Sequence, residues 1–183
     1  LRAEVGARIK AVLAEGSAER LDEPEKVRAL EASIADRGLD AVVESTAYTW
    51  FNRLCALRFM DARGYTPVPA VTPRAGATLP AVLADAAQGV FDPEYGFTRL
   101  VRDRVQSVLA GGSGAGANRT EAAYGVLLEA VCAHYADAMP YLFGEAAASS
   151  LAMPQGLLAE DSILRRIVED MNDGACESVE VLG

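Results

Sequence analysis

The chain has 183 residues, of which 51% are apolar and 23% charged, with a formal net charge of -9 at pH 7. Such a composition is typical of a globular protein and excludes a disordered one. The acidic balance argues against an electrostatic clamp on nucleic acid or on an anionic membrane, although it leaves room for a local basic patch. No apolar run approaches the ~18 residues that a membrane span requires.

The first third of the sequence predicts three helices. An amphipathic pattern covers residues 2–15, and a second one runs from about residue 24 to residue 36. Pro24 marks the start of the second helix, because proline is favoured at the first helical position. The third helix is expected over residues 39–62 and ends at Gly64.

The third predicted helix contains the stretch around which we expect the fold to be built. It is apolar on nearly every side, which is typical of a central, buried helix. Arg58 lies within the apolar sector and needs a partner, since an unpaired buried charge is very costly. Asp61, one turn further on, is the predicted partner. The hypothesis is a core helix with an internal ion pair; the alternative is a polar spot built to bind a partner.

The middle of the chain is interrupted by proline and glycine. Residues 64–80 are predicted to form an irregular, flexible connection. A short hairpin within this connection is the alternative. A short helix is expected over residues 81–87 and another over residues 97–109, with Leu100 on its inward side. Residues 110–118 contain a Gly-rich run and are predicted to be a flexible linker.

The last third predicts a long helix from Asn118 or Thr120 to about Met139, which Pro140 ends or kinks. A short Ala-rich segment follows, and Glu160, Asp161 and Ser162 are expected to start a helix that ends near Gly174. Residues 176–182 are expected to open a further helix. The predicted fold class is therefore all-α, a multi-helix bundle-like domain that spans residues 1–183.

Motifs for catalysis are weak. The Gly-rich run follows a helix and lacks a Lys-Ser/Thr ending, so a linker is favoured over a phosphate loop. Asp92–Tyr95 faintly resembles the Asn/Asp-Pro-Pro-Tyr loop of amino-methyltransferases, but Glu94 replaces the second Pro. His134 is the one histidine, with no Cys at metal-ligand spacing. The three cysteines form no CxxC pair, which indicates reduced thiols in a cytoplasmic protein. No catalytic, cofactor-binding or metal-binding residue is predicted.

Basic residues are the candidates for contact with DNA or a partner, because phosphate contacts come mainly from Arg and Lys. Ordinary solvated faces are the alternative. The candidates are Arg99, Arg102, Arg104, Arg165 and Arg166. The further arginines that we expect to converge with them on one surface are Arg53, Arg63 and Arg74.

Two blocks of sequence resemble a known family. The first is Ala47–Asp61 followed by Gly64 and Tyr65, and the second is Met139–Phe143 with Leu157–Leu164. In this order they resemble the N-terminal region of the PglX-type adenine-specific DNA methyltransferases of the BREX and Pgl phage-defence systems. Residues 179–183 resemble the point at which family members continue into a further helix. The signature residues of the first block are Trp50, Phe51, Asn52, Arg53, Arg58, Phe59 and Asp61.

The resemblance implies that the chain, which starts at Leu1 without an initiator Met, is an N-terminal fragment of a longer protein. It also implies that the parent protein binds S-adenosylmethionine and methylates adenine N6 in double-stranded DNA, through motifs that lie downstream. The implied partners are the rest of the methyltransferase chain, DNA and other defence proteins, with no cofactor in this fragment. The alternative hypothesis is an assembly module that binds protein and not DNA.

Overall fold

The computed structural model describes residues 1–111, 117–144 and 146–177. Within these ranges the chain forms helices joined by turns and loops, and the only strand-like pairing is an isolated antiparallel bridge between Pro73 and Pro80. The prediction of an all-α fold is confirmed. The Gly-rich run at residues 112–116 and the predicted extension beyond residue 177 lie outside the described residues.

In chain order, the helices are α1 (Arg2–Leu13), α2 (Ala18–Asp22), α3 (Pro24–Arg37), α4 (Leu39–Ala62), α5 (Ala81–Ala87), the 3₁₀ helix η1 (Pro93–Tyr95), α6 (Arg99–Ala110), α7 (Ala117–Ala136), α8 (Pro140–Phe143), α9 (Ala147–Leu151), α10 (Ile163–Asp170) and α11 (Asp173–Glu177).

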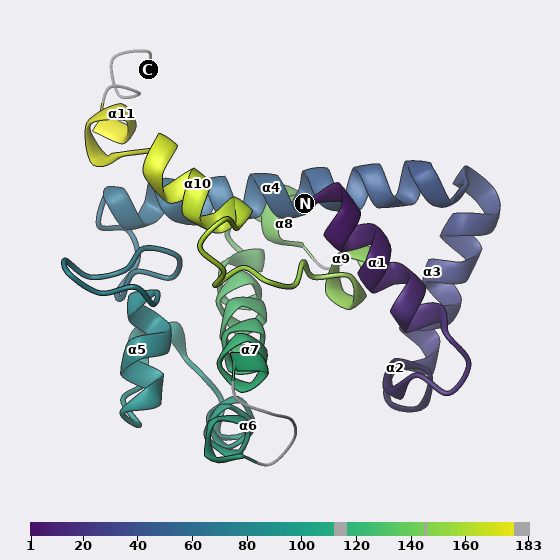
Figure 1. Ribbon diagram of the computed structural model, residues 1–183, viewed down its shortest axis with the longest axis horizontal. Helices are drawn as coiled ribbons and strands as arrows, with labels where there is room; N and C mark the ends of the chain where they lie inside the picture. Colours follow the sequence, from purple (N-terminus) through teal and green to yellow (C-terminus); the bar gives the residue numbers. More distant parts are fainter. Residues whose placement is uncertain (112–116, 145, 178–183) are drawn as a thin grey trace.

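Helix α4 is the spine of the molecule. It runs across the upper part of Figure 1, and two groups of helices lie below its two halves. At one end α1, α3 and α9 pack on its first half; at the other end α5, α6 and α7 form a second group. We refer to these groups, each with its half of α4, as the N-terminal lobe and the second lobe.

Each lobe has its own hydrophobic cluster, and α4 contributes to both. Its first half buries Val42, Val43 and Ala47 in the N-terminal lobe. Its second half buries side chains that include Trp50 and Leu57 in the second lobe. The helix faces a different cluster on each half, which explains why its sequence is apolar nearly all round.

The helix boundaries in the first lobe follow simple local rules. Pro24 occupies the first turn of α3, as expected. Gly38 joins α3 to α4 with φ at 84°, a left-handed conformation that glycine adopts without strain. This turn sends α4 away from α3 and begins the spine.

The prediction that Leu100 lies on the inward side of α6 is wrong. Leu100 is 78% exposed, whereas Val105 of the same helix is fully buried. The two residues are five positions apart, which places them about 140° from each other around the helix axis. Because α6 packs mainly against α7 through the side that carries Val105, Leu100 faces solvent.

The connections differ from the predicted pattern in small ways. Helix α7 ends at Ala136, and Pro140 starts the separate short helix α8 instead of kinking a longer one. Ser162, the last of the three residues predicted to start this helix, caps α10 by accepting a hydrogen bond from the Arg165 amide. The helix ends at Asp170, four residues before the predicted end at Gly174. Residues 64–80 are irregular, as expected; their flexibility stays a prediction.

Candidate functional site on helix α4

The polar side chains of the signature stretch reach across to the C-terminal third of the chain. Trp50 is buried, and its indole Nε1 donates a hydrogen bond of 3.0 Å to the carbonyl oxygen of Ser149. A buried indole N–H normally finds such a partner. The ring therefore joins the middle of α4 to α9.

Arg53 is buried as well and binds the end of α8. Its Nε donates to the Leu142 carbonyl oxygen at 3.1 Å, and its Nη2 donates to the Gly144 carbonyl oxygen at 2.8 Å. The last carbonyls of a helix lack partners within the helix and favour a positive charge. The guanidinium also lies 5.1 Å from the centre of the Trp50 ring, a cation–π arrangement.

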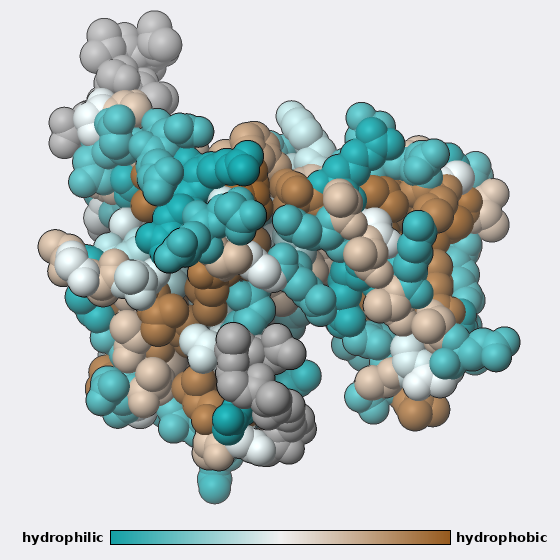
Figure 2. Space-filling view, viewed as in Figure 1, coloured by the Kyte–Doolittle hydropathy of each residue, from teal (hydrophilic) through white to brown (hydrophobic). Residues whose placement is uncertain are grey.

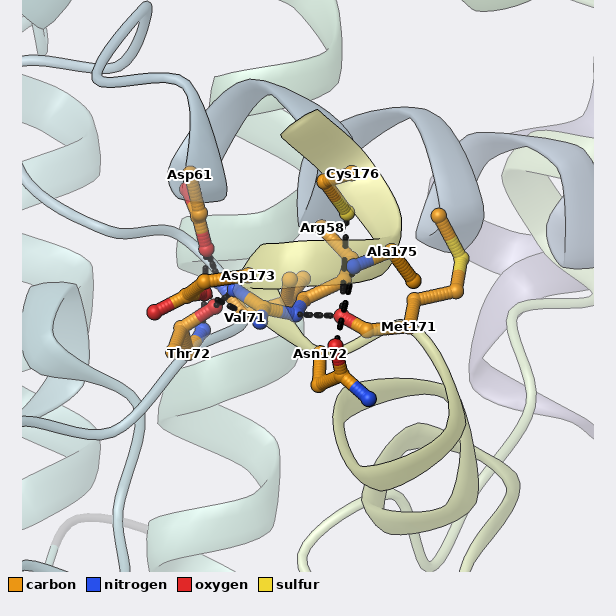
Figure 3. A network of polar contacts seen from close by, with 9 residues as sticks. All are labelled: Arg58, Asp61, Val71, Thr72, Met171, Asn172, Asp173, Ala175 and Cys176. Atoms are coloured by element: carbon orange, nitrogen blue, oxygen red, sulfur yellow. Dashed lines mark hydrogen bonds and ion pairs between the residues drawn. The ribbon is translucent and has the colours of Figure 1, made fainter. Parts of the chain in front are cut away.

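Arg58 likewise binds the C-terminal end of α10 (Figure 3). Its Nε donates to the Met171 carbonyl oxygen at 2.8 Å, and its Nη2 binds the Asp173 carboxylate at 2.6 Å. A third hydrogen bond of 3.2 Å reaches the Thr72 hydroxyl. The burial of Arg58 is confirmed, since only 4% of its side chain is exposed.

The predicted ion pair between Arg58 and Asp61 is wrong, because the charge of Arg58 is matched by Asp173. Arg58 and Asp61 lie three positions apart and about 60° apart around the helix. Figure 3 shows them pointing to different segments: Arg58 toward the turn between α10 and α11, and Asp61 toward the loop that follows α4.

Asp61 accepts hydrogen bonds from the backbone of that loop. Its Oδ1 accepts hydrogen bonds from the Thr66 hydroxyl at 2.8 Å and the Ala70 amide at 2.9 Å. Its Oδ2 accepts from the Val71 and Thr72 amides, each at 2.9 Å. Burial raises the pKa of Asp61, whereas these donors, led by the backbone amides, oppose the rise. The carboxylate thus satisfies amides that an irregular loop would otherwise leave without partners.

The network is a structural junction. Its donors and acceptors join α4, the loop at residues 66–72 and the turn at residues 171–173, which are far apart in sequence. Both carboxylate oxygens of Asp61 are engaged by the protein itself, and so are the three nitrogens of Arg58. The sequence indicated a buried Arg58 but held no local signal for these distant partners.

The five arginines predicted to contact DNA or a partner fall in different places. Arg99 and Arg102 are exposed on α6, and Arg99 pairs with Asp103. Arg104, on the same helix, lines a cleft toward α1. Arg165 and Arg166 are on α10, which lies beside α4 at the opposite side of the view from α6 (Figure 1).

The three further arginines do not extend this set. Arg53 is buried in the junction with α8. Arg63 is half-buried at the C-terminal end of α4, and Arg74 makes a two-pronged ion pair with Asp85 of α5. The eight arginines are thus divided among several sites on the fold. Contact with DNA stays a hypothesis for the exposed pair on α6 and the pair on α10.

A cleft of about 820 Å³ separates the two lobes, and sequence reasoning did not anticipate it. Figure 2 shows a gap in the outline of the molecule between the two lobes. Arg8, Arg104 and Glu129 project into the cleft from three helices. The surrounding protein raises the pKa of Glu129 through partial desolvation, and Arg104 opposes the rise. Glu121 closes one wall by accepting hydrogen bonds from the Leu157 and Leu158 amides.

His134 packs in an aromatic group, with its ring 5.7 Å from that of Tyr95 and 4.7 Å from that of Tyr135. Across the described ranges, no group of three or more His, Cys, Asp or Glu side chains is placed to hold a metal ion. Likewise, no helix in the part of the chain that the structure describes is long and apolar enough to cross a membrane.

Comparison with known proteins supports the predicted relationship. No family model matches the chain. The chain is 37% identical over 156 residues to the adenine-specific methyltransferase BrxX of Escherichia coli O9:H4 (strain HS), a match that covers 81% of this chain. The chain spans only 12% of that relative's length. The resemblance to this kind of adenine-specific methyltransferase is therefore confirmed for one segment of such a protein.

Proposed function

We propose that this chain, a relative of one segment of an adenine-specific methyltransferase, is the N-terminal helical module of such an enzyme in a bacterial phage-defence system. The match to BrxX is the observation that carries the proposal, because it covers most of this chain. Most of the relative's length lies outside the match. The methyl transfer is accordingly assigned to the rest of the parent protein.

In this proposal the parent enzyme is cytoplasmic, binds S-adenosylmethionine and methylates adenine N6 in double-stranded DNA. The module supplies a scaffold. Its support comes from the junction on α4, where Arg53 and Arg58 bind the ends of α8 and α10 and Asp61 binds the following loop. The contact of Arg53 with the Leu142 carbonyl oxygen joins the first sequence block to the second, whereas Arg58 and Asp61 bind residues outside the second block.

Titration calorimetry tests the assignment of roles. Purified 1–183 is expected to bind no S-adenosylmethionine, because the proposal places the cofactor site elsewhere in the parent chain. Saturable binding of the cofactor by 1–183 would contradict the proposal.

DNA contact is the second part of the proposal, and it rests on the exposed Arg99 and Arg102 of α6 and on Arg165 and Arg166 of α10, of which Arg165 is half-buried and Arg166 exposed. Arg99 and Arg102 are on a solvent-exposed side of α6. If they bind phosphates, the variant Arg99→Glu with Arg102→Glu weakens DNA binding and lowers its salt dependence.

The matched control is Lys10→Glu with Arg37→Glu, which makes the same change in net charge on exposed positions of the N-terminal lobe. Equal loss of binding in both variants would show a general effect of charge and not a site on α6. Absence of DNA binding by 1–183 at low salt would favour the alternative of an assembly module that binds protein alone.

A further inference from the structure

One side of α4 carries aromatic side chains that belong to neither hydrophobic cluster. Tyr48 is 67% exposed, Phe51 is 40% exposed, and Tyr65, just beyond the helix, is 57% exposed. Phe59 is half-buried and packs edge-on against the Tyr65 ring at 6.3 Å between centroids. None of the four is part of the cluster in either lobe.

These side chains share one side of the helix. Tyr48, Cys55 and Phe59 lie within about 40° of one another around the axis, whereas Trp50 and Leu57 point about 160–180° away from this direction. Figure 1 shows α1, α5 and α7 all below α4, on the side toward which the two clusters lie. We call Tyr48, Phe51, Cys55, Phe59 and Tyr65 the aromatic face of α4.

The chemistry of the aromatic face is that of an interface. Exposed contiguous apolar surface on a soluble protein marks an interaction site, and Tyr and Phe are enriched in the cores of interfaces. The charged residues at its N-terminal end, Asp40 and Glu44, are exposed and acidic. A complementary surface is therefore an apolar groove with a basic rim.

We propose that the aromatic face docks into such a groove on the methyltransferase region of its own parent chain. This inference rests on the proposed function and names the surface by which the module is held. The match to BrxX covers 81% of 183 residues, about 148, so a continuous match includes α4 wherever it begins. Most of that relative's chain lies outside the match and is available to cover the face. A second copy of this chain is disfavoured as the occupant, because each copy carries a net charge of -9.

Cys55 provides a built-in probe of the face. It is half-buried in the middle of the face, whereas Cys132 and Cys176 are buried. The thiolate form of a cysteine is the nucleophile that attacks maleimide. Desolvation raises the pKa of Cys55 and raises that of Cys132 to about 12, so Cys132 holds far less thiolate at pH 8. Labelling of 1–183 followed by mass spectrometry should therefore modify Cys55 first, and a Cys55→Ser variant should remove this signal.

The test compares Cys55 in 1–183 with Cys55 in the full-length methyltransferase without DNA. The proposal predicts labelling at least tenfold slower in the full-length protein. The variant Phe51→Ser with Tyr48→Ser should restore fast labelling there, whereas the matched control Leu100→Ser, at an exposed apolar position on α6, should not. Slow labelling of Cys132 in every variant shows that the fold is intact.

Equal labelling of Cys55 in 1–183 and in the full-length protein would overturn the docking proposal. Slow labelling of 1–183 itself, with a dimer in light scattering, would overturn it in favour of a second copy. Adenine methylation by the full-length protein is measured in parallel. If the full-length protein methylates adenine while its Cys55 is labelled as fast as in 1–183, only the docking proposal is contradicted. If the full-length protein does not methylate adenine, the proposed function is contradicted.

Discussion

At the scale of single residues, the fold depends on side chains that satisfy distant backbone groups. Asp61 accepts three amides and a hydroxyl from the loop that follows α4. Arg58 serves the end of α10, and its ion-pair partner Asp173 is 74% exposed. Asp61 and Asp173 are both carboxylates of this network, yet the loss of their charges should have unequal effects, because Asp61 accepts four hydrogen bonds and Asp173 is mostly exposed.

Replacement of Asp61 by Asn should lower the free energy of unfolding by roughly 2–4 kcal/mol, because one oxygen becomes an NH₂ group that faces backbone donors. The control Asp173→Asn should cost less than about 1 kcal/mol, since its pair with Arg58 is screened by solvent. Urea denaturation measures both values. A smaller loss for Asp61→Asn than for Asp173→Asn would contradict the role assigned to the carboxylate.

Buried acids that stay protonated make the protein sensitive to alkali. Desolvation raises the pKa of Cys132 to about 12, from an ordinary value near 9. Between these values the folded state keeps a proton that the unfolded state has released, so the free energy of unfolding falls as pH rises. Burial also raises the pKa of Tyr124 and Tyr95, which adds to the decline at higher pH.

The variant Cys132→Ala removes the thiol and should show a shallower loss of stability between pH 9 and pH 11 than the wild type. Denaturation midpoints at several pH values measure this slope. Identical slopes would mean that the Cys132 thiol ionises as readily in the folded chain as in the unfolded one.

At the scale of elements, α4 joins two hydrophobic clusters that have little else in common. The long apolar run of α4 indicated a central helix, and Pro24 and Gly38 mark where α3 starts and stops. The existence and bounds of α3, α4 and α5 were therefore predictable. The short helices α2 and α8 were not, because four or five residues carry no periodic pattern.

The partners of the polar groups on α4 could not be read from the sequence. Spacing along one helix suggested Asp61 for Arg58, but Asp173 lies more than a hundred positions further on and meets Arg58 only through the packing of α10. The exposure of Leu100 and the cleft between the lobes likewise depend on how helices pack, which a local pattern does not encode.

Replacement of Trp50 by Ala should destabilise the protein by roughly 3–5 kcal/mol, because it removes a buried ring and leaves the Ser149 carbonyl without its donor. The matched control is the adjacent aromatic, Phe51→Ala, which lies on the aromatic face outside both clusters and should cost under about 1 kcal/mol. Thermal denaturation distinguishes the two. Similar losses for both variants would contradict the division of α4 into a buried side and a docking side.

At the scale of the whole molecule, the two lobes, the cleft and the aromatic face describe a scaffold. The net negative charge and the distribution of the arginines over several helices argue against an extended DNA-binding surface on this module. The relationship to one segment of a far longer adenine-specific methyltransferase is its central support. We therefore expect the module to act through the rest of the parent enzyme.

Transfer of a radiolabelled methyl group from S-adenosylmethionine to DNA tests this most directly, with a parent methyltransferase from which residues 1–183 have been deleted. The account predicts that the shortened enzyme loses methylation and regains it when purified 1–183 is added, whereas 1–183 alone transfers no label. Full methylation by the shortened enzyme, or methylation by 1–183 alone, would contradict it.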